Sequence, residues 1–190
     1  MLRRSTLVWY AYSGLFRCRR GDAGGMKECP AMTDRPQAAL AAIEAAAGQR
    51  PRPLPRSAYR RFVPLTTRWL DNDAYGHLNN VVYYALFDTA VNGVLIEAGA
   101  LDVAAGEVVG YVVETRCNYF APLAFPQTLE AGIRVSRIGG SSVRYEIGIF
   151  ATGGAETAAR GHFIHVYVDR ATERPVALPE RLMQVVKELA

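Results

Sequence analysis

Cysteine is scarce in this sequence, and its pattern excludes two structural roles. The chain has 190 residues and three cysteines, Cys18, Cys29 and Cys117. An odd number of cysteines without a Cys-x-x-Cys pair indicates neither a disulfide framework nor a zinc site. We therefore expect the protein to reside in a reducing compartment, the cytoplasm.

The sequence also lacks a long hydrophobic run and a strong excess of one charge. No apolar stretch is long enough to cross a bilayer, so we expect no membrane partner. The formal net charge is +4, and the basic residues form no stripe interleaved with aromatic ones. This balance argues against a nucleic-acid partner and suits a small anionic ligand. Half of the residues are hydrophobic, which is enough for a sizeable core.

We predict an N-terminal extension over residues 1–58 and a compact domain over residues 59–190. The extension begins with a basic and then a short apolar stretch, but it lacks an A-x-A cleavage site, so we interpret it as a partly disordered extension. Alanine-rich residues 36–48 predict a short helix within it. The proline-rich string RPRPLPRS that follows cannot be helical and predicts a linker.

Hydrophobic patterning in the compact domain predicts a strand, a long helix and then four more strands. Residues 60–69 are rich in β-forming residues, and Pro64 places them at a sheet edge or a bulge. Residues 79–98 are apolar nearly all round, which predicts a helix buried on most sides, with Asn79 as its N-cap. Alternating apolar and polar residues predict strands over residues 108–120, 127–138, 142–151 and 156–169.

The order of these elements predicts an α+β fold. Gly139-Gly140 and Gly153-Gly154 separate the last three strands as hairpin turns, so neighbouring strands are expected to be antiparallel. A short amphipathic helix over residues 179–190 ends the chain. Only the long helix can cover one face of such a sheet, and we expect the sheet to curl around it.

The polar segment DNDAYGHLNN, residues 71–80, is the main candidate for chemistry. It places Asp71, Asp73 and His77 just before the predicted helix start. The first amides of a helix have no internal partner and could polarise a carbonyl oxygen, while a carboxylate beside them could activate water or attack. Gly76 would let the backbone approach a ligand. The same residues are also ordinary caps and turn residues, so spacing alone leaves both interpretations open.

A longer string around this segment, TRWLDNDAYGHLNNVVYYALFDTA, resembles the signature of the 4-hydroxybenzoyl-CoA thioesterase branch of the hotdog-fold acyl-CoA thioesterases. The matching residues are Trp69, Asp71, Asp73, Gly76, His77, Asn79, Asn80, Tyr83, Phe87, Asp88 and Ala90. Weaker similarity continues through RCNYFAPLAF and RIGGSSVRYE, so that the resemblance covers about residues 60–170.

The resemblance implies a hotdog fold, in which an antiparallel sheet wraps around one long helix. It also implies hydrolysis of a fatty-acyl or aryl-acyl CoA to free acid and CoA, without metal or cofactor. It places the catalytic carboxylate on Asp73 and the polarising amides around residues 77–80. Some relatives carry a histidine at the position of Asn80, whose amide does not titrate but could hydrogen-bond a carbonyl or a water. A homodimer or homotetramer is implied, with sheets joined edge to edge and the site at the interface.

Further residues are candidates for substrate binding, each with a structural alternative. Around the turn GGSSVR, Arg137, Ser141, Ser142 and Arg144 could bind the phosphates of CoA or form a solvated hairpin. In the predicted helix, Tyr83, Tyr84 and Phe87 could line an acyl pocket or belong to the core.

The histidines and Cys117 have mainly structural interpretations. We expect His77 to hydrogen-bond the turn and fix the entry to the helix, although an acid–base role stays open. His162 and His165 lie three residues apart in a predicted strand and should face opposite sides, which disfavours a shared metal site. Cys117 has no paired histidine nearby in sequence and is better explained as a core cysteine than as a nucleophile.

Two rival functions remain open at this point. One is a hydratase or dehydratase of acyl thioesters on the same fold, which would need an aspartate and a histidine converging on one carbon. The other is a module that binds acyl-CoA without turning it over.

Overall fold

The computed structural model describes residues 50–190, so the helix predicted over residues 36–48 lies outside the described residues. In chain order the elements are η1 (Arg56–Ala58), β1 (Arg61–Leu65), η2 (Trp69–Asp71), α2 (Val82–Glu97), β2 (Val108–Tyr119), β3 (Leu129–Ile138), β4 (Ser142–Ala151), β5 (Ala159–Asp169) and α3 (Glu180–Glu188). The strands and α-helices follow the predicted order, with ends shifted by a few residues. Among residues 50–190, no helix has the length and apolar character needed to cross a membrane.

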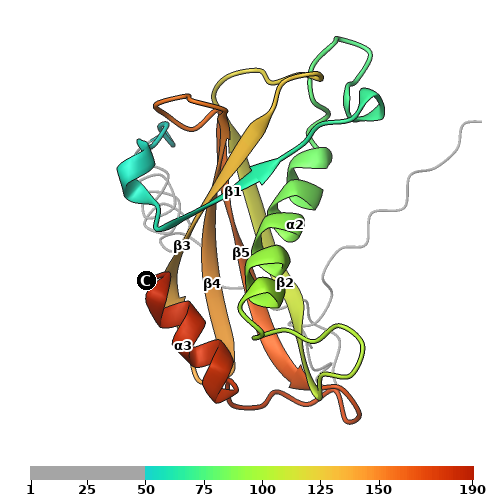
Figure 1. Ribbon diagram of the computed structural model, residues 1–190, viewed down its shortest axis with the longest axis vertical. Coiled ribbons are helices and arrows are strands. Elements are labelled where there is room, and N and C mark those ends of the chain that lie inside the picture. Colours follow the sequence, from blue (N-terminus) through green and yellow to red (C-terminus); the bar gives the residue numbers. More distant parts are fainter. Residues whose placement is uncertain (1–49) are drawn as a thin grey trace, which may run out of the picture. The chain divides into compact units, whose positions relative to one another are not determined.

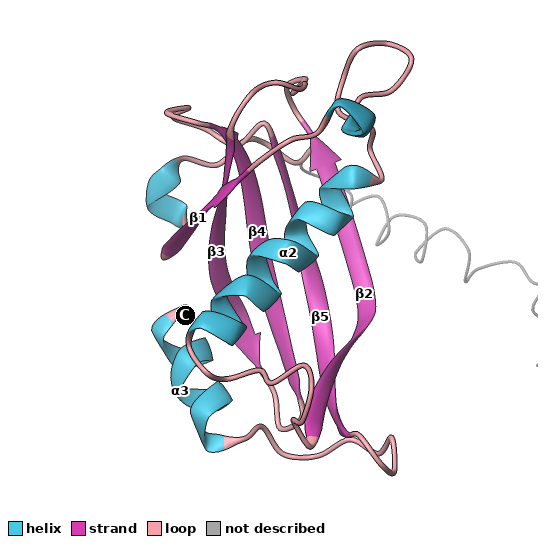
Figure 2. Cartoon of the chain, turned by 45° about the vertical axis from the view of Figure 1, so that its right-hand side comes forward, coloured by secondary structure: helices cyan, strands magenta, loops and turns pink. Residues whose placement is uncertain are grey.

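The strands form one antiparallel sheet in the order β1-β3-β4-β5-β2. The long helix α2 lies across one face of this curved sheet, and α3 packs beside its β3 end (Figure 1). The same layering is visible after a 45° turn, with α2 in front of the sheet (Figure 2). This is the α+β hotdog arrangement that the sequence led us to expect.

The core lies between α2 and the inward-facing residues of the sheet. The buried residues of α2 are Tyr83, Leu86, Phe87, Ala90, Val91, Val94 and Leu95. The opposite side of the helix is open, and Ile96 there is 51% exposed. The prediction that this helix is buried on most sides was therefore wrong for a single chain, because one sheet can cover only one side of one helix.

The outer face of the sheet is covered by the end of the predicted linker. The amide of Leu54 donates to Thr157 Oγ1 at 2.9 Å, and the Thr157 amide donates back to the Leu54 carbonyl at 3.0 Å. Tyr59 then lies over Gly132 and Gly148, whose missing side chains make room for its ring. The segment just before residue 59 is thus bonded to the sheet, although its prolines predicted a linker. The prediction that this string cannot be helical was wrong at its end, where Arg56–Ala58 form the 3-10 helix η1.

The two edges of the sheet differ in length and exposure. β1 has five residues and contains Pro64, which confirms the prediction of an edge position. β2 has twelve residues, is interrupted by a bulge at Val113, and exposes a row of large apolar side chains. Tyr111 is 47% exposed and Val113 is 61% exposed. A long apolar edge of this kind is a template for pairing with another chain.

Candidate active site

The loop between β1 and α2 is closed at its base by Asp71. Its carboxylate accepts hydrogen bonds from the backbone amide of Arg68 at 2.7 Å and from the Arg68 guanidinium at 2.8 Å. The Asp71 carbonyl accepts the amide of Asn79 at 2.8 Å, which joins the two ends of the loop. The hydrogen bonds from Arg68 hold the pKa of Asp71 below its usual range. These contacts make Asp71 part of the frame of the loop.

Asp73 lies inside this loop and presents one carboxylate oxygen to the surroundings. Its Oδ1 accepts the amides of Tyr75 at 2.8 Å and His77 at 3.2 Å. Gly76 permits this tight turn because its φ of +79° lies in the left-handed region. Both bonds to Asp73 go to Oδ1, so within residues 50–190 its Oδ2 remains available to a ligand or water.

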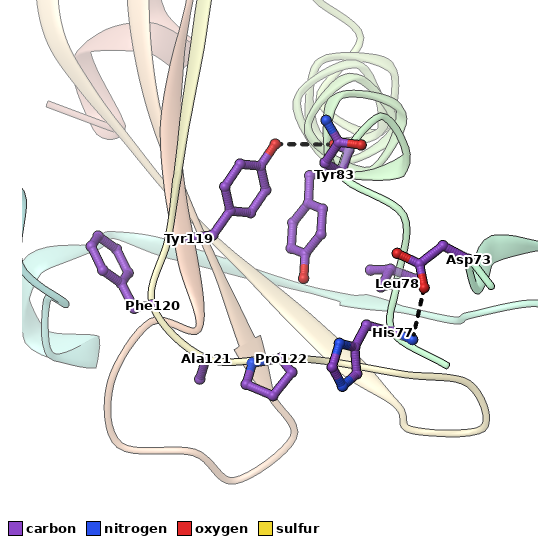
Figure 3. Close-up of a pocket in the computed structure, with 9 residues that line it drawn as sticks. Asp73, His77, Leu78, Tyr83, Tyr119, Phe120, Ala121 and Pro122 are labelled. Atoms are coloured by element: carbon purple, nitrogen blue, oxygen red, sulfur yellow. Dashed lines mark hydrogen bonds between the residues drawn. The ribbon is translucent and has the colours of Figure 1, made fainter. Parts of the chain in front are cut away.

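An open pocket of about 400 Å³, pocket 1, borders this loop. Its walls come from the loop, the start of α2 and the segment after β2, and comprise Asp73, His77, Leu78, Asn80, Tyr83, Tyr119, Phe120, Ala121 and Pro122. Figure 3 shows the Tyr83 hydroxyl, the His77 ring and Pro122 around the same space, with the Asp73 carboxylate at its side. The structure therefore brings together Asp73, His77, Asn80 and Tyr83, four of the residues singled out in the sequence.

The N-cap of the helix lies two residues later than predicted. α2 starts at Val82 with Val81 as its N-cap, whereas Asn79 was expected to cap it. Asn79 Oδ1 instead accepts the amide of Val81 at 3.1 Å, and its carbonyl accepts the amide of Val82 at 2.9 Å. Asn79 thus caps a turn that precedes the helix, because its backbone is already tied to Asp71.

Most of the backbone amides expected to polarise a carbonyl already donate hydrogen bonds within the chain. His77 donates to Asp73 Oδ1, Leu78 to the carbonyl of Leu123 at 2.6 Å, and Asn79 to the carbonyl of Asp71. Of residues 77–80, only Asn80 has a backbone N–H that no described residue accepts. Asn80 also lines pocket 1. Of the four amides predicted to polarise a carbonyl, the Asn80 amide is therefore the one without an acceptor in this part of the chain.

Two tyrosines fix the position of Asn80, and one of them was not predicted. Tyr119 donates its hydroxyl to the carbonyl of Asn80 at 3.1 Å, and its ring packs edge-on against Tyr83 with centroids 5.0 Å apart. Burial raises the pKa of Tyr83 to about 12, and burial together with the neighbouring Cys117 raises the pKa of Tyr119. Both phenols stay protonated at neutral pH. Spacing could not reveal this pair, since Tyr83 and Tyr119 lie on different elements.

The residues predicted to bind CoA phosphates lie far from pocket 1 in one chain. The group comprises Arg137, Ser141, Ser142 and Arg144, at the turn between β3 and β4. Ser142 on β4 pairs with Val166 on β5, and Val166 pairs with Tyr111 on β2. The turn therefore lies at the Tyr111 end of β2, whereas pocket 1 lies at the Tyr119 end. Eight residues of strand separate these two tyrosines, about 26 Å. Arg144 is also engaged, with its Nε 2.7 Å from Glu146 Oε1.

Tyr84 and Phe87 lie outside the walls of pocket 1. Phe87 is completely buried, and its ring packs edge-on against Phe163 with centroids 5.8 Å apart. Tyr84 is half-buried beside Phe87, at 6.1 Å between centroids. In a single chain both residues belong to the core or pack against it, which was the structural alternative. A contact of either residue with an acyl group stays a prediction.

The remaining candidates occupy the places that their residue types suggested. His162 lies on the outer face, where Nε2 is 2.7 Å from Glu114 Oε1, whereas His165 faces inward between aromatic rings. Cys117 is half-buried, and burial raises the pKa of its thiol to about 11. Within residues 50–190, no three histidine, cysteine or acidic side chains are grouped to hold a metal ion.

The family profile of the thioesterase-like superfamily matches residues 67–186, which include the whole of pocket 1. The chain belongs to the thioesterase-like superfamily. It is accordingly a thioester hydrolase with the hotdog fold. No curated protein matches the sequence.

Solved structures share this fold. The PA5185 protein from Pseudomonas aeruginosa strain PAO1 is 54% identical with a TM-score of 0.71, over 73% of this chain and 96% of that one. The PA2801 protein from Pseudomonas aeruginosa is 24% identical with a TM-score of 0.63, over 67% and 98% of the chains. Slr0204, a 1,4-dihydroxy-2-naphthoyl-CoA thioesterase from Synechocystis, is 16% identical with a TM-score of 0.61, over 67% and 96%. The last two comparisons bear on the fold alone.

Proposed function

We propose that this thioesterase hydrolyses an acyl-CoA, fatty-acyl or aryl-acyl, to free acid and CoA, with Asp73 as the catalytic carboxylate. The observation that carries the proposal is the pairing of two groups at pocket 1. Asp73 offers a carboxylate oxygen without a partner, and Asn80 offers a backbone N–H without one, each stated for the described residues. A base or nucleophile beside an oxyanion donor is the minimum that acyl transfer requires.

In the proposed reaction the thioester carbonyl oxygen accepts a hydrogen bond from the Asn80 amide. Asp73 then removes a proton from water as the water oxygen bonds to the carbonyl carbon, or its own carboxylate attacks to form an anhydride that water later opens. The carbon–sulfur bond breaks, and the sulfur leaves as the CoA thiolate, which takes up the released proton. The Tyr119 hydroxyl donates to the carbonyl of Asn80 and so restrains this residue through the peptide group that follows its N–H.

Membership of the thioesterase-like superfamily favours hydrolysis over hydration of an enoyl thioester. Hydration would need an aspartate and a histidine acting on one carbon, and Asp73 and His77 both line pocket 1. Asp73 accepts a hydrogen bond from the backbone amide of His77. In this proposal His77 serves the geometry of the turn, and the comparison of thioester cleavage with enoyl-CoA hydration tests the alternative.

We also propose that two copies pair along β2, which would complete the site. Antiparallel pairing about the middle of β2 sets Gly110 of one copy opposite residue 117 of the other, two residues from the Tyr119 that lines pocket 1. Gly110 pairs with Tyr167, whose amide donates to the Ser141 carbonyl. The turn predicted to bind CoA phosphates would then lie about three strand spacings, roughly 15 Å, from pocket 1 of the other copy.

The proposal is tested by hydrolysis of a panel of acyl-CoA esters that covers chain lengths and aryl groups. We expect Asp73→Asn to lower kcat by about 100-fold or more, the usual contribution of a catalytic carboxylate. The matched control is Glu107→Gln, which removes an exposed carboxylate outside pocket 1 and should leave kcat unchanged.

Three outcomes would contradict the assignment in different ways. Full activity of Asp73→Asn would remove Asp73 from the mechanism. Hydration of enoyl-CoA without thioester cleavage would support a hydratase. Binding of acyl-CoA without turnover of any ester in the panel would support a non-catalytic module.

A further inference from the structure

A second pocket, pocket 2, lies between α2 and the far half of β2. It has a volume of about 220 Å³ and is mostly apolar, with Leu95, Leu101 and Val109 among its walls. His165 lines this pocket from β5, and neither its sequence position nor the mechanism proposed above gives it a role. An apolar cavity of about 150 Å³ holds a benzene molecule, so pocket 2 has room for a substituted ring or a short chain.

His165 is a buried polar side chain without a partner. It is 2% exposed, and its Nε2 is enclosed without a hydrogen-bond partner among the described residues. In the described part of the chain, hydrogen bonds to a histidine ring involve His162 alone. The rings of Tyr145 and Phe163 pack at 5.2 and 5.7 Å from the imidazole. Neither ring nitrogen thus has a partner among the described residues, and an N–H on either one costs stability unless a ligand accepts its hydrogen bond.

The surroundings of His165 set its charge and its tautomer. Burial lowers the pKa of the ring, partly offset by Asp88, so the ring is neutral at pH 7. A proton on the enclosed Nε2 would have no acceptor, and an orphaned buried N–H is rare, so the proton belongs on Nδ1. The ring therefore has a hydrogen-bond donor to offer at Nδ1.

Gly110 leaves the approach to Nδ1 open. A Cβ atom at this position would lie 3.2 Å from His165 Nδ1 and 3.0 Å from Tyr167 Cε1, and both Gly110 and His165 line pocket 2. The loop on the far side of the pocket is held by Arg170, whose Nη2 donates to the Val103 carbonyl at 2.9 Å. Three other polar residues line pocket 2, and each has a partner: Asn92 donates to Asp88, the Tyr167 hydroxyl pairs with that of Tyr145, and Arg170 donates to backbone carbonyls. Among the polar residues of pocket 2, His165 alone has no hydrogen-bond partner in the described part of the chain.

We infer that pocket 2 receives the far end of the acyl group and that Nδ1 of His165 selects acyl groups with an uncharged oxygen acceptor there. This rests on the proposed thioesterase function and on pairing along β2, because Gly110 would then lie next to pocket 1 of the other copy. A thioester bound in that pocket would extend its acyl group into pocket 2 across the shared edge. His165 acts as a specificity-determining residue, and a hydrocarbon group of equal size leaves its donor unpaired.

The test compares substrates that differ only in the acceptor. Methoxybenzoyl-CoA and ethylbenzoyl-CoA have nearly the same shape, but only the methoxy group has an oxygen. Across the ortho, meta and para isomers, we expect at least one methoxy ester to exceed its ethyl counterpart in kcat/KM by about fivefold, the effect of one neutral hydrogen bond. His165→Phe should bring this ratio to about one. Equal rates for every wild-type pair, or an unchanged ratio in His165→Phe, would overturn the inference.

Two variants separate the hydrogen bond from general repacking. Tyr145→Phe frees the hydroxyl of Tyr167, another wall of pocket 2, while it leaves the His165 ring in place, and it should keep the wild-type ratio. Gly110→Ala places a methyl group against Nδ1 and should lower the ratio while His165 is still present. A loss of the ratio in Tyr145→Phe as well would assign the effect to packing and contradict the role of His165.

A binding measurement keeps this inference distinct from the thioesterase proposal. If no ester is hydrolysed, the proposed function fails, and pocket 2 is then judged by the imidazole nitrogen NMR signals of His165. Anisole should shift these signals and ethylbenzene should not, if the ring donates to an oxygen in the pocket. Identical responses to the two probes would overturn the assignment of pocket 2, whatever the enzymatic activity.

Discussion

The carboxylate of Asp71 and the guanidinium of Arg68 form a two-point pair, in which Oδ1 lies 2.8 Å from Nη2 and 3.1 Å from Nε. Asp71 is only 3% exposed, whereas Asp73 two residues later is half-buried and keeps an oxygen free for a ligand. The two aspartates of this short loop therefore have different roles. Asp71 stabilises the loop, because a carboxylate whose oxygens all accept hydrogen bonds cannot also serve as a base, and Asp73 keeps an oxygen for chemistry.

Replacement of Asp71 by Ala is expected to affect stability more than chemistry. It leaves the Arg68 amide without its acceptor and opens the base of the loop, which should lower the free energy of unfolding by about 1–3 kcal/mol. Asp73→Asn should leave the free energy of unfolding nearly unchanged and lose turnover. Urea unfolding of both variants checks this contrast, and equal loss of stability would show that Asp73 also belongs to the frame.

The Asp71 pair also predicts a dependence of stability on pH. The pKa of Asp71 is lower in the folded state than the ordinary value near 3.9, because Arg68 stabilises the charged form. Its contribution to stability is therefore complete above about pH 4 and disappears as the pH falls through the folded pKa. Thermal melts between pH 6 and 2 should show a smaller loss in Asp71→Ala than in wild type. Parallel curves would argue against the pair.

Tyr119→Phe tests whether the Tyr119 hydroxyl restrains Asn80. The hydroxyl of Tyr119 holds the Asn80 carbonyl at 3.1 Å, so its loss should let the Asn80 amide drift from the thioester oxygen. We expect kcat to fall by about 3- to 10-fold with little change in KM, since the oxyanion contact strengthens in the transition state. Tyr111→Phe, on the same strand but outside pocket 1, is the control. A rise in KM alone would indicate a contact with substrate instead.

Val113→Lys should prevent pairing of two copies along β2. Val113 is 61% exposed at the bulge of this edge strand, and a lysine there would put two like charges close together at a twofold contact. Light scattering should detect a monomer, with activity reduced in parallel. Val103→Lys changes an equally exposed valine in a loop and should remain dimeric; it is a control for the oligomeric state alone, because Val103 also lines pocket 2. A Val113→Lys protein that stays dimeric would place the interface elsewhere.

The groove under Tyr59 should tolerate no side chain. A Cβ on Gly148 would lie 2.5 Å from the Tyr59 ring and hydroxyl, so Gly148→Ala should destabilise the protein by about 1–3 kcal/mol. Gly140→Ala meets nothing within 4 Å and is the control. In a Tyr59→Ala background, Gly148→Ala should cost less, and denaturant unfolding of the double-mutant cycle measures the difference. Strict additivity would mean that Tyr59 does not fill this groove.

Cys117 should react slowly with thiol reagents. Its pKa of about 11 leaves about one thiol in a thousand ionised at pH 8, and only the thiolate reacts. Peptide mapping after brief iodoacetamide treatment should find Cys117 unmodified in the folded protein and modified in urea. Cys117→Ala should retain activity. Rapid labelling of the folded protein would revive the nucleophile interpretation.

The hydrophobic pattern of the sequence was sufficient to predict the fold, because each strand and helix has its own periodicity of apolar residues. Strands β3 to β5 alternate apolar and polar residues at period two, and α2 is the single apolar segment long enough to cover a sheet. The ends of α2 were harder to place, since Asn79 has the residue type of a cap but is held outside the helix by Asp71. The sequence also did not reveal that one side of α2 is exposed. A helix that one sheet covers and a helix that is buried on all sides can have the same apolar composition.

The sequence by itself determined the hotdog order of elements, the family and the loop that holds Asp73, because these depend on local propensity and on a dense motif of consecutive residues. Tertiary structure alone decided which amide is free, that Tyr119 supports Asn80, and that His165 is enclosed without a partner. These facts depend on contacts between residues far apart in the chain, such as Leu78 with Leu123, and pairings of that kind leave no periodic trace in a single sequence.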